Sequence, residues 1–398
     1  MKKKKNVTNT VSWVGINDWE LRQFHGNEYS TKRGSSYNSY LVQEEKNVLI
    51  DTVFVPFAKE YVANLAKVID LNKIDYIIMN HAEPDHSGAL PELMKLIPNT
   101  PIYCTENAVK SIKGHYHQEW NFVTVKAGDK LSIGNGKEFT FIPAPMLHWP
   151  DTMFSYMSGD NILFSNDAFG QHFCSSMLFN DLVDQAELQQ EAIKYYANIL
   201  TPFNKFVTKK IEEVVKLNLP IDYICTSHGV VWRENPLQIV QKYAEWADNY
   251  QENQITLIYD TMYNGTRIIA ENIANGIMQG DKSIAVKLYN AGKMDKNDIL
   301  TEVFRSKAIL MGSPTVNNGA MYATTGLLEM IKGLKFVNKK AAAFGTYGWN
   351  DQASKHIDKS LREAGFDVVL EPLSNNWEPS DDMLEKCVEY GKKLVSLL

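Results

Sequence analysis

Cysteine is scarce in this sequence. Its four cysteines in 398 residues form no C-x-x-C pair, so the chain encodes neither a disulfide framework nor an iron–sulfur cysteine cluster. No apolar run approaches the roughly 20 residues that a membrane-spanning helix needs. The lysine-rich start is followed by polar residues instead of the apolar segment of a secretory signal. We therefore expect a cytoplasmic protein with reduced thiols.

An excess of basic residues is also absent. The formal net charge is -6, so electrostatics give no reason to expect nucleic acid or an anionic membrane as a partner. Hydrophobic residues make up 44% and charged residues 22% of the chain, which is ordinary for a globular protein. The length is sufficient for two domains, each with its own core.

A cluster of possible metal ligands follows directly after a strand-like apolar run at residues 74–79. Within six residues the chain carries His81, Glu83, Asp85 and His86. Carboxylates among imidazoles, without a thiolate, suit iron or manganese at least as well as zinc. The competing interpretation is a helix N-terminus capped by Asp85, with histidines that are merely hydrogen-bonded.

Three further strand-like runs each end in a possible ligand. They cover residues 139–147, 161–166 and 221–227 and lead to His148, Asp167 and His228. A sandwich of sheets with helices outside would gather these strand ends along one edge. Four imidazoles and three carboxylates exceed the needs of one ion, and they suit two ions that share a bridging carboxylate. The sequence therefore predicts a dinuclear metal site.

The complete spacing resembles that of the flavodiiron proteins. After His81-x-Glu83-x-Asp85-His86 come 61 residues to His148, 18 to Asp167 and 60 to His228. The related metallo-β-lactamase hydrolases typically carry His at the position of Glu83. The resemblance implies an α/β protein: an N-terminal metallo-β-lactamase-like αββα sandwich over residues 1–252, and a C-terminal flavodoxin-like doubly wound parallel sheet over residues 253–398.

The resemblance also implies roles for individual residues. One iron would be held by His81, Glu83 and His148, the other by Asp85, His86 and His228, with Asp167 as the bridge. A His and a Tyr would lie beside the open face of the site, where His25 matches the former and either Tyr195 or Tyr196 the latter. Without the family, His25 in its Gly-flanked loop is as easily a structural hydrogen-bonding residue. We expect His172, close after Asp167, not to be a ligand.

From residue 254 onward, strands and helices alternate, as in a doubly wound parallel sheet. Five strand-like runs cover residues 255–259, 283–289, 308–312, 341–345 and 367–370. In flavodoxin-like sheets the ligand crevice lies outside the carboxyl ends of the strands. Three loops lie at that edge, and the resemblance to flavodoxins and flavodiiron proteins implies that they bind FMN: Thr261, Met262, Tyr263, Asn264, Gly265 and Thr266; Ser313, Pro314, Thr315, Val316 and Asn317; and Thr346, Tyr347, Gly348 and Trp349.

The first of these loops favours a monophosphate. Its hydroxyl and backbone N–H groups precede a helix whose dipole attracts an anion, and it lacks the Lys of a nucleoside triphosphate site. Trp349 offers a large flat face for stacking on the isoalloxazine.

The resemblance implies an oxidoreductase that reduces dioxygen to water, nitric oxide to nitrous oxide, or both, at a non-haem diiron site supplied with electrons by FMN. The family's arrangement is a head-to-tail homodimer or a dimer of dimers. Because no rubredoxin or flavin reductase domain follows, we expect an external donor such as rubredoxin or a reduced deazaflavin. The preferred gas and the donor stay open at this point.

Two other functions are compatible with parts of the sequence. A dinuclear zinc hydrolase of the metallo-β-lactamase superfamily could carry a flavodoxin module, although Glu83 speaks against it. An electron carrier or gas sensor with a vestigial metal site is the other possibility, and the complete ligand set speaks against that.

Overall fold

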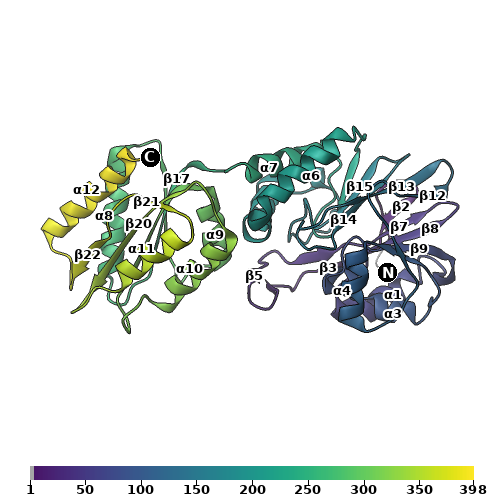
Figure 1. Ribbon diagram of the computed structural model, residues 1–398, viewed down its shortest axis with the longest axis horizontal. Helices are drawn as coiled ribbons and strands as arrows, with labels where there is room; N and C mark the ends of the chain where they lie inside the picture. Colours follow the sequence, from purple (N-terminus) through teal and green to yellow (C-terminus); the bar gives the residue numbers. More distant parts are fainter. Residues whose placement is uncertain (1–3) are drawn as a thin grey trace. The chain divides into compact units, whose positions relative to one another are not determined.

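The computed structural model describes residues 4–398, which divide into two compact units (Figure 1). One unit comprises the chain up to Tyr195 together with Phe203–Ala244, and the other comprises Tyr196–Pro202 and Glu245–Leu398. The first three residues of the lysine-rich start lie outside the described part. Within residues 4–398, no helix has the length and apolar character needed to cross a membrane.

Two sheets form the first unit. The larger has seven strands in the order β1 (Lys5–Asn6), β2 (Val11–Trp13), β7 (Tyr40–Gln43), β8 (Asn47–Ile50), β9 (Ile74–Ile78), β10 (Ile102–Cys104) and β11 (Phe122–Thr124). The smaller has five, in the order β12 (Lys130–Gly134), β13 (Lys137–Pro143), β14 (Met153–Met157), β15 (Ile162–Asn166) and β16 (Tyr223–Thr226). Residues of both sheets, such as Ile50 and Phe164, share one apolar core. This confirms the predicted sandwich of sheets.

Helices and short hairpins complete the first unit. The helices are α1 (Ala58–Leu65), α2 (Pro84–Ser87), α3 (Leu90–Met94), α4 (Glu106–Tyr116), α5 (Gln185–Tyr195), α6 (Asn204–Lys216) and α7 (Leu237–Ala247), whose residues from Glu245 onward belong to the second unit. Two hairpins pair β3 (Ile16–Asp18) with β6 (Ser35–Tyr37), and β4 (Gln23–Phe24) with β5 (Tyr29–Ser30). Figure 1 shows α1, α3 and α4 beside the larger sheet, and α6 and α7 beside the smaller one. The helices therefore lie outside the sandwich.

The second unit is built on a parallel sheet. Its strand order is β18 (Ala285–Asn290), β17 (Glu252–Tyr259), β19 (Ser306–Pro314), β20 (Lys340–Tyr347) and β21 (Asp367–Val368), and β22 (Leu373–Asn376) also pairs with β20. Helices α8 (Gly265–Gly280) and α12 (Asp381–Ser396) pack on one face, and α9 (Lys296–Arg305), α10 (Tyr322–Leu334) and α11 (Ala353–Glu363) lie on the other. This confirms the doubly wound sheet, with one more strand than the sequence indicated.

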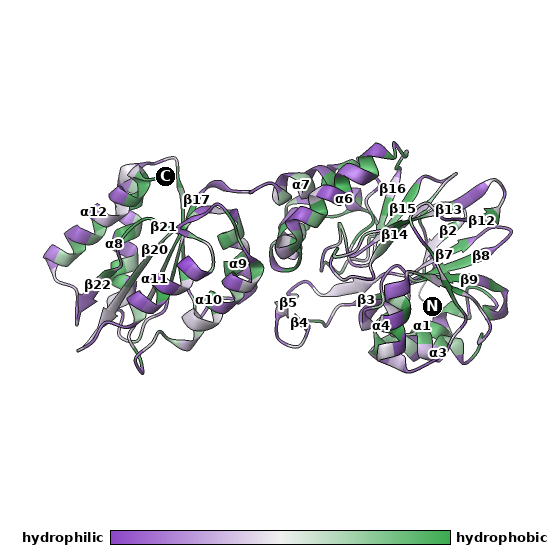
Figure 2. Ribbon diagram, viewed as in Figure 1, coloured by the Kyte–Doolittle hydropathy of each residue, from purple (hydrophilic) through white to green (hydrophobic). Residues whose placement is uncertain are grey.

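Helices α8 and α12 pack against each other through glycines. A Cβ atom on Gly276 would lie 2.0 Å from the carbonyl oxygen of Val388, and one on Gly391 would lie 2.3 Å from that of Ile273. In Figure 2 both helices alternate hydrophobic and hydrophilic residues, as expected of helices with one face on a sheet. The absent side chains therefore allow close backbone contact between these helices.

Candidate metal centre and cofactor crevice

Chain direction brings the seven expected ligands to one place. Strands β13, β15 and β16 run the same way, with β14 antiparallel between the first two, so their carboxyl ends share one edge of the smaller sheet. His148, Asp167 and His228 follow these ends. Of the other four, His81 and Glu83 lie in the turn after β9, and Asp85 and His86 lie in the short helix α2. All seven side chains are buried or nearly so.

Asp167 lies between two pairs of histidines. Its Oδ2 atom is 3.6 Å from His81 Nε2 and 3.3 Å from His148 Nε2. Its Oδ1 atom is 3.0 Å from His86 Nε2 and 3.5 Å from His228 Nε2. One carboxylate thus presents a separate oxygen to each pair.

Each pair of histidines has a second carboxylate of its own. Glu83 Oε2 lies 3.2 Å and 3.4 Å from the Nε2 atoms of His81 and His148. Asp85 Oδ2 lies 3.2 Å from His86 Nε2 and 3.1 Å from His228 Nε2. The resulting groups of two imidazoles and one carboxylate, on either side of Asp167, are those that the family resemblance implies for two irons.

These distances fit two metal ions. Two nitrogen or oxygen ligands that are each about 2.1 Å from one ion lie about 3.0–3.4 Å apart, close to the observed separations. His86 Nε2 and Asp167 Oδ2 are buried atoms without a hydrogen-bond partner in the described structure, a costly state that a bound cation relieves. Asp85 makes no cap, because Glu83 is the N-cap residue of α2 and no side-chain cap hydrogen bond forms there. The capped-helix interpretation is therefore wrong.

Electrostatics point the same way. Burial alone would lower the pKa of the His86 and His148 imidazoles, but the neighbouring carboxylates raise the pKa of each to about 9. Burial alone would raise the pKa of Asp167, but the imidazoles around it hold that pKa well below its usual range. The buried carboxylate of Asp167 is therefore stabilised by positive charge on the imidazoles around it, a charge that bound cations would supply in their place.

Asp151 supports the cluster from behind, although it is not among the residues predicted from the sequence. Its Oδ2 atom lies 2.9 Å from His81 Nδ1 and accepts a hydrogen bond of 2.7 Å from the backbone N–H of Ala82. In the same way, His228 Nδ1 lies 2.7 Å from the carbonyl oxygen of Ser36. Such contacts hold the ring so that Nε2 faces the site. In the sequence, the only sign of this role is that Asp151 is a carboxylate three residues after the expected ligand His148.

Replacing Asp151 with alanine is expected to weaken metal binding about 10- to 100-fold, because His81 loses the contact that sets its ring orientation. Competitive titration of the metal-free protein with a chelator measures the affinity. Asp181→Ala is the matched control, since that carboxylate pairs with Arg233 at the surface. Equal affinity in the Asp151→Ala variant and the wild type would contradict the assigned role.

Of the three residues expected beside the cluster, His25 and Tyr195 lie near it and Tyr196 does not. His25, in the turn between β4 and β5, places Nε2 2.9 Å from Glu83 Oε1. The buried ring of Tyr195 lies 6.4 Å from that of His228. The ring of Tyr196 packs instead 5.4 Å from Trp246 in the second unit.

His25 and His172 differ in environment. The side chain of His25 is 38% exposed; burial would lower its pKa, but the hydrogen bond and charge of Glu83 raise it overall. His172 is buried, and its Nδ1 lies 2.8 Å from Ser35 Oγ, with its ring 4.7 Å from that of His228. His172 thus packs behind a ligand and contacts none of the carboxylates named above by a hydrogen bond.

A crevice opens in the second unit where β17, β19 and β20 end. These strands are parallel, so the three expected loops meet at one edge. Two adjoining hollows there have volumes of about 230 Å³ and 400 Å³. Residues of all three loops line them: Thr261, Met262, Tyr263, Gly265, Pro314, Thr315, Val316, Asn317, Thr346, Tyr347, Gly348 and Trp349.

The remaining expected loop residues support the crevice without lining it. Asn264, with a φ of 70°, precedes α8, Thr266 Oγ1 lies 2.8 Å from Thr346 Oγ1, and Ser313 Oγ accepts a hydrogen bond from the N–H of Met321. Thr261 Oγ1 is buried without a hydrogen-bond partner in the described structure. A hydroxyl of this kind beside the N-terminus of a helix fits the phosphate of FMN.

Trp377, which lies outside the three predicted loops, also lines the crevice. Its backbone N–H donates a hydrogen bond of 2.8 Å to the carbonyl oxygen of Tyr347. A Cβ atom on Gly348 would lie 2.9 Å from the indole ring of Trp377. Trp349 and Trp377 are 89% and 64% exposed. Two accessible aromatic faces therefore border the crevice.

Comparison with known proteins identifies both halves. The family model of the ODP family beta lactamase matches residues 36–229, and that of flavodoxin matches residues 257–391. An anaerobic nitric oxide reductase flavorubredoxin of Enterobacter sp. (strain 638) is 58% identical over 390 residues, which are 98% of this chain and 81% of that protein.

Two solved structures are similar over almost the entire chain. The rubredoxin oxygen:oxidoreductase of Desulfovibrio gigas has a TM-score of 0.96 at 33% identity, covering 99% of this chain and 98% of that one. The flavodiiron protein of Giardia intestinalis has a TM-score of 0.95 at 33% identity, covering 100% and 97%. On these similarities in sequence and fold, the chain belongs to the flavodiiron family.

Proposed function

We propose that this protein reduces nitric oxide to nitrous oxide at a diiron site, with electrons passed through FMN. Two NO, two electrons and two protons give N₂O and H₂O; the same site would reduce O₂ to water with four electrons and four protons. The observation that carries the proposal is the position of Asp167 between two ligand groups, one of which contains Glu83. Nitric oxide is favoured because the 58% identical relative is named a nitric oxide reductase, whereas the 33% identical one is named an oxygen oxidoreductase.

The ligand assignment is part of this proposal. One iron would be held by His81, Glu83 and His148, the other by Asp85, His86 and His228, with Asp167 as a ligand shared by both. FMN is held by the three loops of the crevice, with Trp349 as a stacking partner. Carboxylate and imidazole ligands without thiolate suit iron. The two domains are assigned to residues 1–252 and 253–398.

The protein's own side chains hold protons and orient the ligands. When bound, the iron pair supplies redox and Lewis-acid chemistry, and FMN stores electrons. His25 is partly exposed and contacts Glu83 through Nε2, so it can exchange protons with solvent and hold one at Nε2 beside the site. Tyr195 and Phe24, both buried, keep water from the side of His228.

Replacing His25 with glycine is expected to lower kcat at least about tenfold through loss of proton supply, with iron and FMN content unchanged. Glycine suits this position, because His25 has a φ of 50°. Added imidazole should restore part of the activity, and the solvent isotope effect on kcat should rise. His117→Gly is the matched control, since His117 is exposed and has a φ of 52°. Full activity in His25→Gly would contradict the role.

The electron donor and the assembly belong to the proposal as well. We infer a rubredoxin-type donor, because relatives carry rubredoxin in their names, with a reduced deazaflavin as the other candidate. We infer a head-to-tail homodimer, or a dimer of such dimers, in which the FMN of one chain serves the irons of another. The cytoplasmic location stays a prediction.

Reconstitution tests the function directly. Protein produced with iron and FMN is reduced and mixed with nitric oxide or dioxygen; gas consumption and N₂O formation are measured with reduced rubredoxin as donor. The proposal expects N₂O formation and a higher kcat/KM for nitric oxide than for dioxygen. A zinc-only site with esterase or nuclease turnover, and no consumption of either gas, would establish the hydrolase alternative instead.

A further inference from the structure

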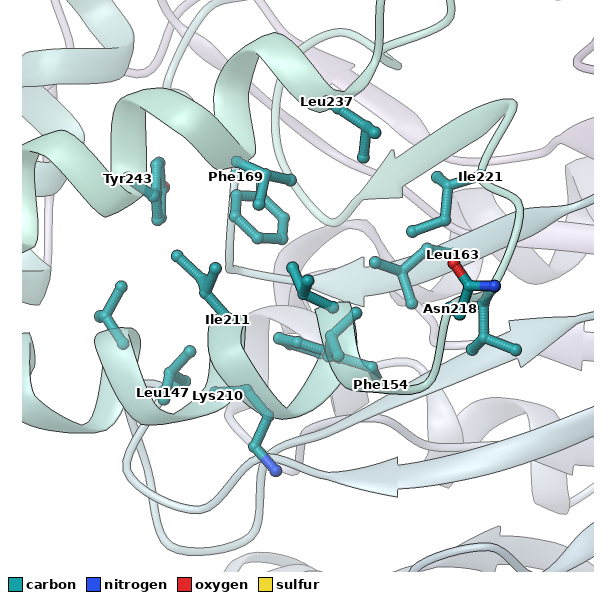
Figure 3. A pocket seen from close by; sticks show the side chains of 15 residues that line it. Leu147, Phe154, Leu163, Phe169, Lys210, Ile211, Asn218, Ile221, Leu237 and Tyr243 are labelled. Atoms are coloured by element: carbon teal, nitrogen blue, oxygen red, sulfur yellow. The ribbon is translucent and has the colours of Figure 1, made fainter.

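The first unit contains an apolar cavity outside the metal cluster (Figure 3). Its volume is about 200 Å³, and it lies between strands β14 and β15 and the helices α6 and α7. Its buried walls include Leu147, Phe154, Leu163, Phe169 and Val207.

The lining of this cavity is mainly apolar, with Lys210, Asn218 and Tyr243 as its polar members. Lys210 contributes to the wall, but its Nζ atom donates hydrogen bonds of 2.6 Å to the carbonyl oxygen of Pro143 and to Glu213. The ammonium group is therefore satisfied outside the cavity, and Figure 3 shows it at the periphery. A charged ligand would lose its hydration without a compensating charge here.

The size of the cavity restricts its occupant further. Pockets for drug-sized ligands have volumes of about 300–1,000 Å³, more than the about 200 Å³ found here. An engineered cavity of about 150 Å³ lined by Leu, Ile and Phe stays dry and binds xenon or benzene. The occupant should therefore be small and apolar.

The cavity has exposed residues at its rim, and its buried wall includes residues of two loops that carry expected metal ligands. At its rim, Val215 is 66% exposed and Leu237 is 44% exposed. At its buried end, Leu147 immediately precedes His148 in the chain, and Phe169 follows Asp167 by two residues. Solvent thus meets the cavity on one side, and two of the metal-binding loops border it on the other.

We propose that this cavity binds a small apolar diatomic gas and admits it to the metal cluster. The inference rests on the proposed function, whose substrates are uncharged diatomic gases. Such gases lose little on leaving water for an apolar space, so the cavity raises their concentration next to the loops of His148 and Asp167. His25 lies in the turn between β4 and β5 and is not one of the residues that line the cavity.

Xenon tests the binding step independently of catalysis. Crystals of the holoprotein are pressurised with xenon, and the anomalous signal is measured. We expect xenon between Phe169 and Val207, both of which line the cavity. Crystals without xenon in this cavity would overturn the inference, whatever the activity of the enzyme.

Filling the cavity tests the access step. Val207→Phe is expected to raise the KM for nitric oxide at least about threefold at unchanged kcat, with unchanged iron and FMN content. Val214→Phe fills the same space from a half-buried position and replaces Val207→Phe if that variant does not fold. Thr208→Phe adds the same ring to the exposed face of α6 and should leave KM unchanged.

The outcomes separate the two proposals. An unchanged KM in the folded filled variants overturns the access role. Wild-type protein that binds xenon in the cavity but consumes neither gas overturns the proposed function and retains the cavity as a site for apolar gases.

Discussion

Replacing Asp167 with asparagine is expected to remove at least one metal ion and to lower gas turnover more than about a thousandfold, or roughly 4 kcal/mol in the barrier. The residue is 1% exposed, and each of its oxygens faces a different pair of histidines. An amide retains the shape but loses the charge, and its NH₂ group cannot bind a cation. Metal analysis and steady-state rates with nitric oxide measure the two effects.

The control for this substitution is Asp222→Asn. Asp222 is exposed and accepts a hydrogen bond from the side chain of Asn161, so its variant should keep both metals and full activity. Ser227 donates a hydrogen bond of 2.6 Å to Asp167 Oδ1, which the asparagine oxygen can still accept. An Asp167→Asn variant that retains two irons and more than about a tenth of the activity would show that this residue is no bridge.

The position of this cluster could be predicted because chain direction decides where strand ends lie. His81 follows β9, and Asp167 and His228 follow the parallel strands β15 and β16. The strand-like runs at residues 74–79, 161–166 and 221–227 mark these strands in the sequence, and a possible ligand follows each run within two residues. The local motif His-x-Glu-x-Asp-His then supplies the other ligands from a single turn.

The surroundings of the cluster could not be predicted in the same way. Tyr195 ends α5, and Tyr196 begins a π-helical turn, so the directions of two adjacent rings depend on a change of helix type that propensity does not encode. Asp151 is 70 positions from His81, the residue that it orients. Such contacts depend on how loops that are distant in the sequence pack together in the folded protein.

The strand that positions Trp377 shows a further limit. Strand β22 has the polar sequence Leu-Ser-Asn-Asn and a partly exposed surface, a composition with low strand propensity. It forms because four of its residues pair in parallel with β20. Backbone pairing with an existing sheet edge therefore overrides local preference, and the second aromatic wall of the crevice could not be seen in the sequence.

The second large effect is expected in the flavodoxin-like unit, where Gly391→Ala should destabilise the fold by about 2–3 kcal/mol. The added Cβ would lie 2.3 Å from the carbonyl oxygen of Ile273 and 2.8 Å from the amide nitrogen of Ile277. Both are backbone atoms within α8, so no side chain can rotate away, and the two helices must separate. Thermal unfolding followed by flavin fluorescence measures the loss.

Gly326→Ala is the matched control and has the opposite expected sign. Gly326 lies in the middle of α10, and a Cβ added there meets no atom within 4 Å. Alanine in an exposed helix interior is more favourable than glycine by about 0.5–1 kcal/mol, so this variant should unfold at a slightly higher temperature. If both variants unfolded at a higher temperature than the wild type, the intrinsic helix preference of alanine would outweigh the backbone contact between α8 and α12. Opposite shifts would establish that this contact requires glycine.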